Sequence, residues 1–303
     1  MNTRAYLAFL ESWKKAALDK GIPPESYECS VKVLQDPSGR SRYMFGLILN
    51  PNRQKRASSG FSGCHLCRRV VEASENPVQD LTGKYQFTDM VLAINDFPHY
   101  IGSSLAIARG TGTDERPMHS TKDLDYLQRD LQQLMAFSDE TGLRVIHNTL
   151  GAGETVPRHE HWHIMNWVGL YQKAGLKYGL EATDFEEVKG FSGVYSLPNF
   201  PFACIVFDRD LGRVQHFLRN LQIRLRSPLL DGSIPHAKCY AEVGLLVIPT
   251  KKDVGRLFGS NEVAGHLFVE SQAEYDSFDY RSAIEKLSQG LFGKNEINLE
   301  SFL

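Results

Sequence analysis

Three histidines stand at alternate positions, His159, His161 and His163, within the segment GAGETVPRHEHWHIMNW at 151–167. On a β-strand, residues two apart face the same side, whereas on a helix each such step turns the side chain by roughly 200°. The histidines therefore form a single surface only if the segment is a strand. We expect a strand whose opposite face is mostly core and carries Glu160, Trp162 and Ile164.

Three explanations of this histidine surface compete. The histidines are exposed strand residues without a shared purpose, or they bind zinc together, or one of them attacks a phosphate. A neutral imidazole attacks phosphorus without first losing a proton, and the N–P bond that it forms is labile. The turn Gly151-Ala152-Gly153 precedes the histidines closely and offers backbone N–H groups of the kind that bind phosphate. This combination favours nucleophilic catalysis on a phosphate.

The composition limits the class of protein. The 303 residues suffice for one large domain or two ordinary ones. A formal net charge of −2 argues against nucleic acid as a partner, and no apolar run has the length of a membrane span. The N-terminus is typical of an amphipathic helix rather than a signal peptide, which predicts a cytoplasmic protein. Five cysteines, an odd number, argue against a disulfide framework.

Helical and strand patterns along the chain predict an α+β fold, in which antiparallel sheets carry helices packed on one face. The pattern predicts helices at 4–20, between Ser120 and Gly142, at 210–224 and at 280–291. It predicts strands at 43–50, 90–95, 103–108, 143–150, 202–207, 241–249 and 265–270.

The order of these elements partly repeats after about residue 180, which indicates two similar halves in one chain. We divide the chain into an N-terminal helix with a lead-in strand at 1–60, a half that carries the histidines at 61–180, and a C-terminal half at 181–303. The boundary is placed in a loop at 180–198, where Gly190, Gly193 and Pro198 occur.

The segment NTLGAGETVPRHEHWHI at 148–164 resembles the active-site segment of the histidine-triad superfamily. It is most similar to the galactose-1-phosphate uridylyltransferase branch, which also contains dinucleoside polyphosphate phosphorylases and GDP-hexose phosphorylases. In that branch an asparagine strand, a glycine turn and His-x-His-x-Gln follow one another. The stretch KCYAE at 238–242 and the Gly-His pair at 265–266 resemble the C-terminal part of the GDP-hexose phosphorylases.

The resemblance implies a role for each residue of this segment. His161, the middle histidine, would be the nucleophile that forms a covalent nucleotidyl-histidine. Phosphate contacts would come from Asn148, Gly151, Ala152 and Gly153, and the hydroxyl of Thr155 is a further candidate. The chain has His163 where the branch usually has glutamine, and histidine at this position is the rule among the histidine-triad hydrolases. This departure leaves the acceptor open between phosphate, a sugar phosphate and water.

A metal site is indicated by SGCHLC, in which Cys64 and Cys67 have a spacing that suits two thiolates on one zinc ion. A redox pair would usually open a helix in a thioredoxin-like unit, and no such unit is visible here. The resemblance adds His119, just before the expected helix, and His159. We therefore expect a structural Cys₂His₂ Zn²⁺ site, with a surface role for His119 as the alternative.

The nucleotide pocket is expected at LAINDFPHYIG, 92–102, which resembles a strand and turn that line this pocket in the branch. Asn95 and Asp96 would contact the base or the ribose, although the same residues also suit an ordinary turn. The C-terminal half would complete the pocket. There Lys238 would be able to neutralise phosphate charge, but we interpret it as a loop lysine.

These features predict a nucleotidyltransferase of the phosphorylase type. It would cleave the phosphoanhydride of a dinucleoside polyphosphate such as Ap4A, or of a nucleoside diphosphate sugar such as a GDP-hexose. His161 would carry the nucleotidyl group and pass it to phosphate or a sugar phosphate. The alternatives are a histidine-triad hydrolase that uses water, and a non-catalytic nucleotide-binding regulator. A homodimer is common in the family that the chain resembles.

Overall fold

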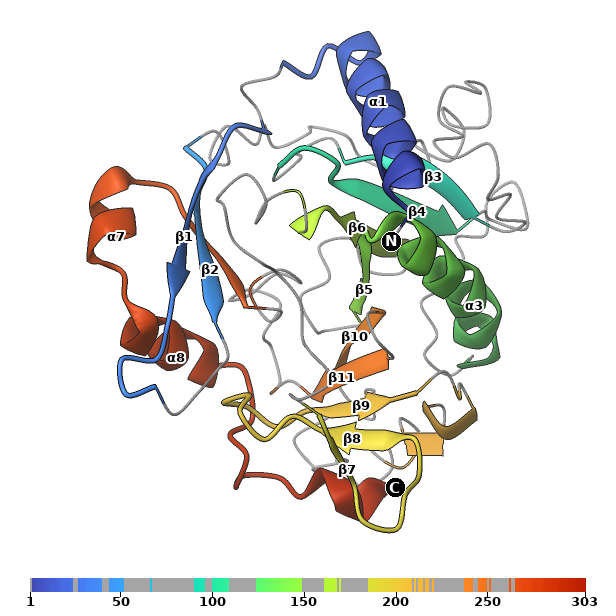
Figure 1. Cartoon of the computed structure of the whole chain (residues 1–303), viewed down its shortest axis with the longest axis vertical. Coiled ribbons are helices and arrows are strands. Elements are labelled where there is room, and N and C mark those ends of the chain that lie inside the picture. The colour runs from blue at the N-terminus through green and yellow to red at the C-terminus, as the bar shows by residue number, and fades with distance from the viewer. Residues whose placement is uncertain are drawn as a thin grey trace.

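The computed structural model describes residues 2–23, 27–39, 44–51, 66, 90–95, 100–108, 124–148, 161–167, 169, 185–208, 210, 212–214, 216–217, 220, 237–241, 245–249, 251, 262 and 265–303. Its largest element is a nine-stranded sheet in the order β3-β4-β6-β5-β10-β11-β9-β8-β7, in which every neighbouring pair is antiparallel (Figure 1). In this spatial order the strands are β3 (Met90–Ile94), β4 (Ser104–Ala108), β6 (His161–Met165), β5 (Arg144–Asn148), β10 (Ala237–Ala241), β11 (Leu245–Pro249), β9 (Ile205–Phe207), β8 (Val194–Ser196) and β7 (Glu186–Glu187).

Two long helices cover one face of this sheet, α1 (Thr3–Asp19) and α3 (Leu124–Thr141) (Figure 1). Asn2 caps α1, since its side chain accepts a hydrogen bond from the backbone N–H of Arg4 at 3.0 Å. The apolar face of each helix enters one core with the sheet, to which Phe9, Trp13, Leu134, Phe137, Trp162 and Ile164 belong. Burial of these large side chains is the main source of stability for this layer.

A smaller sheet lies against the other face and is formed by β1 (Ser30–Leu34), β2 (Phe45–Leu49) and β12 (His266–Val269). The strands β1 and β2 are antiparallel, whereas β2 and β12 are parallel. Two helices, α7 (Gln272–Ser277) and α8 (Tyr280–Ser288), lie beyond this sheet (Figure 1). The rings of Phe45 in β2 and Tyr280 in α8 are 5.3 Å apart. A short 3₁₀ helix, η6 (Leu299–Phe302), ends the chain.

The antiparallel α+β prediction is confirmed, but two details of it are wrong, the extent of one strand and the content of one loop. One strand was expected at 241–249. The structure instead has two strands there, because 241 is the last residue of β10 and 245–249 are β11, and these strands pair antiparallel. The loop expected at 180–198 contains β7 and β8. Because β5 pairs with β10, one sheet runs through both proposed halves of the chain. The exact limits of those halves stay a prediction.

A hydrogen-bond network fastens the end of β6 to α1. The hydroxyl of Tyr6 donates to Oδ1 of the buried Asn166 at 3.1 Å, and the backbone N–H of Gly169 donates to the same oxygen at 2.9 Å. Nδ2 of Asn166 donates to the carbonyl of Ile101 at 3.1 Å, and Nε1 of Trp13 donates to the carbonyl of Ser103 at 3.0 Å. Helix α1 thus holds both β6 and the turn between β3 and β4 in place.

Substitution of Tyr6 by phenylalanine tests this network. The change keeps the ring and removes the hydroxyl, so we expect the free energy of unfolding to fall by about 1–2 kcal/mol, the value of a buried hydrogen bond. Chemical denaturation measures it. The matched control is Tyr27→Phe, because the ring of Tyr27 packs on Trp13 at 5.1 Å and no hydrogen bond of its hydroxyl occurs within the described residues. Equal stability of the two variants would contradict the role given to Tyr6.

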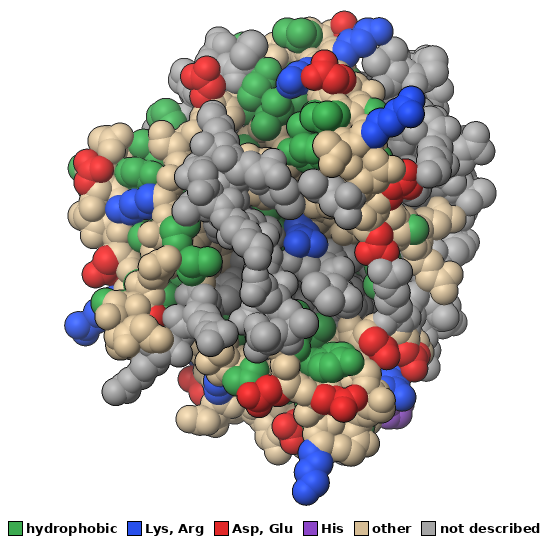
Figure 2. Space-filling view, viewed as in Figure 1, with side chains coloured by type: hydrophobic (Ala, Val, Ile, Leu, Met, Phe, Trp, Pro, Cys, Tyr) green, Lys and Arg blue, Asp and Glu red, His purple; other side chains and the backbone are tan. Residues whose placement is uncertain are grey.

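The described surface is mixed in charge. On the face in Figure 2, acidic and basic side chains are interspersed and do not gather by sign, in keeping with the formal net charge of −2. Within the described ranges, the helices are all too short or too polar to cross a membrane.

Candidate active site

The histidine surface is built on β6, the strand between β4 and β5 near the middle of the protein. His161 is buried, with 4% of its surface exposed, and His163 is half-buried. Their rings lie 5.2 Å apart at an interplanar angle of 66°. Trp162 and Ile164 are completely buried on the opposite face. The strand predicted from the alternating histidines is therefore confirmed from His161 onward.

The register of the sheet places two further predicted residues in line with His161. Trp162 pairs with His147, so one more step along the antiparallel register sets Asn148 opposite His161. The next strand sets Lys238 opposite Asn148. The backbone thus brings the proposed nucleophile, a proposed phosphate ligand and a lysine into one row, and the interpretation of Lys238 as a loop residue is wrong.

Asn95 lies on the same face but further along the sheet. It follows β3, its backbone N–H donates to the carbonyl of Ser103 at 3.4 Å, and it is half-buried. Val91 is in the row of His161, since both pair with Ile107. Four residues of strand separate Val91 from Asn95, which corresponds to roughly 13 Å. Because β3 is also two strand positions, or roughly 10 Å, from β6, Asn95 lies well apart from His161 on this face.

Within the Cys-x-x-Cys stretch the structure describes Leu66 alone. Leu66, which stands between Cys64 and Cys67, is 1% exposed and packs in a cluster with Val91, Ala93, Leu105 and Ile107. Within β4, Leu105 pairs with His163 and Ile107 pairs with His161. Leu66 therefore lies over the histidine face of the sheet, beside β6.

The remaining predicted site residues lie outside the described residues. They are Cys64, Cys67, Asp96, His119, Gly151, Ala152, Gly153, Thr155 and His159. Within the part of the chain that is described, no three His, Cys, Asp or Glu side chains are grouped as a metal site.

Sequence reasoning missed a buried polar group at the far end of the histidine face. Arg144 is opposite Met165, and the ring of His266 stacks on Trp167 at 4.2 Å and 22°. Complete burial, together with the charge of Arg144, lowers the pKa of His266 to about 3. His266 is therefore neutral at physiological pH and joins the two sheets by packing. The pair Gly265-His266 was noted in the sequence only because of the family resemblance. No sequence pattern indicated Arg144.

Comparison with known proteins identifies the fold of this chain. No protein-family model matches the chain, and no curated protein sequence matches it. The crystal structure of yeast Ap4A phosphorylase Apa2 is similar, with a TM-score of 0.63 at 13% identity over 97% of this chain and 96% of that chain. Its complex with Ap4A has a TM-score of 0.60 at 14% identity over 97% and 99% of the two chains. The chain has the fold of this phosphorylase.

The likeness to Apa2 extends over nearly the whole of both chains. The Apa2 complex with AMP has a TM-score of 0.61 at 12% identity and covers 95% of this chain and 96% of that chain. The histidine-triad-like fold expected from the active-site segment is thereby confirmed. Both sheets and both halves of the present chain belong to the shared fold, so the likeness is not confined to the histidine strand.

Proposed function

We propose that the chain is a nucleotidyltransferase of the phosphorylase type that acts on dinucleoside polyphosphates such as Ap4A. One observation carries the proposal: a fold shared end to end with yeast Ap4A phosphorylase Apa2 holds two histidines side by side on one sheet face, with Asn148 in the row of His161. Apa2 was crystallised with AMP and with Ap4A, which makes a nucleotide with a phosphate chain the first substrate class to test.

The first step follows from the burial of His161. An imidazole nitrogen attacks the α-phosphorus, an N–P bond forms, and the P–O bond to the departing polyphosphate breaks. His161 is 4% exposed, so the covalent nucleotidyl-histidine forms where the protein limits access of water. His163, whose ring is 5.2 Å away, is the neighbouring group best placed to hold the His161 ring in orientation.

The second step returns the enzyme to its starting state. An oxygen of inorganic phosphate attacks the same phosphorus, the N–P bond breaks, and a nucleoside diphosphate leaves. For Ap4A the products are ATP from the first step and ADP from the second. We expect backbone N–H groups of 151–153 to stabilise the charge that develops on the non-bridging oxygens in both steps. The nucleoside would extend toward Asn95, and Asp96 would bind the ribose.

The identity of the acceptor is tested by product analysis. The protein is incubated with radiolabelled Ap4A, with and without inorganic phosphate, and the nucleotides are separated. With phosphate we expect ADP and ATP in equal amounts over many turnovers. Without phosphate we expect at most one ATP per chain and no ADP. GDP-hexose and UDP-hexose serve as competing substrate classes. No turnover of any of these nucleotides, together with measurable binding, would instead indicate a nucleotide-binding regulator.

A hydrolase is the second candidate, and His163 is the observation that favours it. Glutamine is usual at this position in the transferase branch, whereas the hydrolases of the superfamily have histidine. A histidine is able to activate water as a general base, which glutamine is not. AMP and ATP as products, in amounts that phosphate does not change, would establish this alternative.

We also propose a structural Zn²⁺ held by Cys64, Cys67, His119 and His159. The position of Leu66 supports it, because this buried residue stands between the two cysteines in the sequence and lies over the histidine face beside β6. His159 precedes His161 by two residues and belongs to the same run of alternate positions. Two thiolates and two imidazoles are a ligand set that zinc prefers in closed, four-coordinate sites. Bound there, zinc would hold the segment in place and support the orientation of His161.

A further inference from the structure

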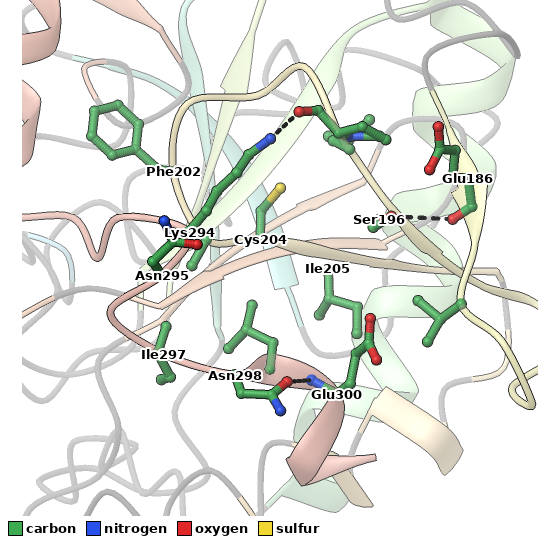
Figure 3. Close-up of a pocket in the computed structure, with 15 residues that line it drawn as sticks. Glu186, Ser196, Phe202, Cys204, Ile205, Lys294, Asn295, Ile297, Asn298 and Glu300 are labelled. Carbon is green, nitrogen blue, oxygen red and sulfur yellow. Dashed lines mark hydrogen bonds between the residues drawn. The ribbon is translucent and has the colours of Figure 1, made fainter.

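A second pocket lies at the far edge of the nine-stranded sheet. It has a volume of about 510 Å³ and is enclosed by β7, β8, the residues that enter β9, and the C-terminal stretch around 294–300 (Figure 3). Its volume is within the range of about 300–1,000 Å³ that small-molecule sites occupy. In the sheet, β9 is four strand positions from β6, or roughly 19 Å. The pocket is therefore separate from the histidine site.

The floor of this pocket is apolar, and a backbone hydrogen bond holds the C-terminal stretch against the sheet. Leu197, Phe202, Ile205 and Leu299 line it, and all four are buried. The C-terminal stretch is tied to the sheet, because the backbone N–H of Ala203 donates to the carbonyl of Phe292 at 2.8 Å. A ligand with an apolar body would displace water from this floor, and that displacement favours binding.

The cationic side of the pocket is formed by Lys294. Its ammonium donates to the carbonyl of Pro198, which leaves two of its three N–H groups for a ligand (Figure 3). Burial lowers the pKa of Lys294, while electrostatic interactions with Cys204 and Glu186 raise it. Asn295 lies beside Lys294 in Figure 3, and no hydrogen bond of its side-chain amide occurs within the described residues.

The anionic side is formed by two carboxylates, those of Glu186 and Glu300. In Figure 3 Glu186 is on the opposite side of the pocket from Asn295, and Glu300 is near the floor at Ile205. Between described residues, neither carboxylate accepts a hydrogen bond. Counting Lys294 and the two glutamates, the lining has a net charge of −1, so it disfavours nucleotides and other polyphosphates.

We propose that this pocket binds a free α-amino acid with an apolar side chain. Its carboxylate would pair with Lys294 and the amide of Asn295, its ammonium with Glu186 or Glu300, and its side chain would cover the floor. A zwitterion is the ligand class that satisfies both charges of the pocket at once. The pocket would then serve as a binding site apart from the nucleotide chemistry, and the proposal does not depend on the proposed function.

Isothermal titration of the full chain with L-leucine and L-phenylalanine tests this. Leucinamide lacks the carboxylate and N-acetyl-leucine lacks the ammonium, so we expect each to bind about tenfold more weakly than leucine, the cost of one charge-assisted hydrogen bond. Lys294→Met is expected to weaken leucine binding to a similar degree and to leave leucinamide unchanged. Glu186→Gln is expected to weaken leucine and to leave N-acetyl-leucine unchanged.

The matched control is Lys189→Met, which removes an exposed lysine from the turn after β7 that does not line the pocket. It is expected to bind leucine as the unaltered chain does. Both Lys294 and Glu186 are exposed at the rim, so their substitution should leave the fold intact, and circular dichroism verifies this. Absence of binding at millimolar leucine overturns the proposal. Equal binding of leucine, leucinamide and N-acetyl-leucine overturns it as well.

Discussion

Substitution of His161 by alanine is expected to lower kcat for Ap4A phosphorolysis by a factor of about 10³ or more, because it removes the atom that forms the covalent bond. The loss should appear in kcat rather than in KM, since the phosphate chain is bound by other groups. Alanine is smaller than histidine and apolar, and His161 lies at the edge of the core with 4% exposure. The strand should therefore persist in the variant. Steady-state kinetics with ADP and ATP as products measure the effect.

His216→Ala is the matched control for this experiment. His216 is exposed, and its ring lies 3.0 Å from the side-chain amide of Asn220, on an element apart from the histidine strand. The control should keep the rate of the unaltered chain to within about twofold. A His161→Ala variant that retains its full rate, while remaining folded, would exclude His161 as the nucleophile.

Loss of the zinc site is the second large expected effect. Protein purified without chelator should contain about one zinc per chain, and Cys64→Ser should lower this to near zero after dialysis, because the three ligands that remain hold the ion much less tightly than four. Since the site would join distant segments, we expect the melting temperature to fall by more than about 5 °C. Elemental analysis and thermal denaturation measure the two quantities.

Cys29→Ser provides the control for zinc loss. Cys29 is a half-buried cysteine that packs beside the smaller sheet and is not one of the proposed zinc ligands. It should keep the full zinc content. Absence of zinc from the unaltered chain would refute the Cys₂His₂ site, and zinc that persists in both Cys64→Ser and His119→Ala would show that the ligands are others.

The histidine strand was predictable because its pattern is local. His161 and His163 alternate with Trp162 and Ile164. This alternation has the two-residue period of a strand and predicts that Trp162 and Ile164 face the core. The structure has the strand, and Trp162 and Ile164 are completely buried. The same holds for α1, whose apolar spacing at Phe9 and Trp13 places both residues in the core. Where a short window of sequence decides the structure, the prediction succeeded.

Long-range pairings were not predictable in this way. The parallel pairing of β12 with β2 joins residues more than 200 positions apart, as with Phe268 and Ile48, and no local pattern indicates it. The strand β10 was missed, and the strand expected at 241–249 began too early, because the second strand of a hairpin is easily extended into the end of the first. The row that joins His161, Asn148 and Lys238 depends on this missed strand.

The site was predictable in part. His161 and Asn148 came from the active-site segment, and the register sets them opposite each other. No sequence pattern indicated Asn166. Its side chain accepts hydrogen bonds from Tyr6 and Gly169, and folding alone brings Tyr6 close to it. Arg144 was missed for the same reason.

The central claim is that His161 carries the nucleotidyl group, and the mass of the intact protein tests it most directly. The chain is incubated with Ap4A in the absence of phosphate, quenched, and measured by mass spectrometry. The account predicts a mass increase of one adenylyl group, located on His161, absent from His161→Ala and removed when phosphate is added. Phosphate-dependent turnover without such an adduct, or an adduct on another residue, would contradict it.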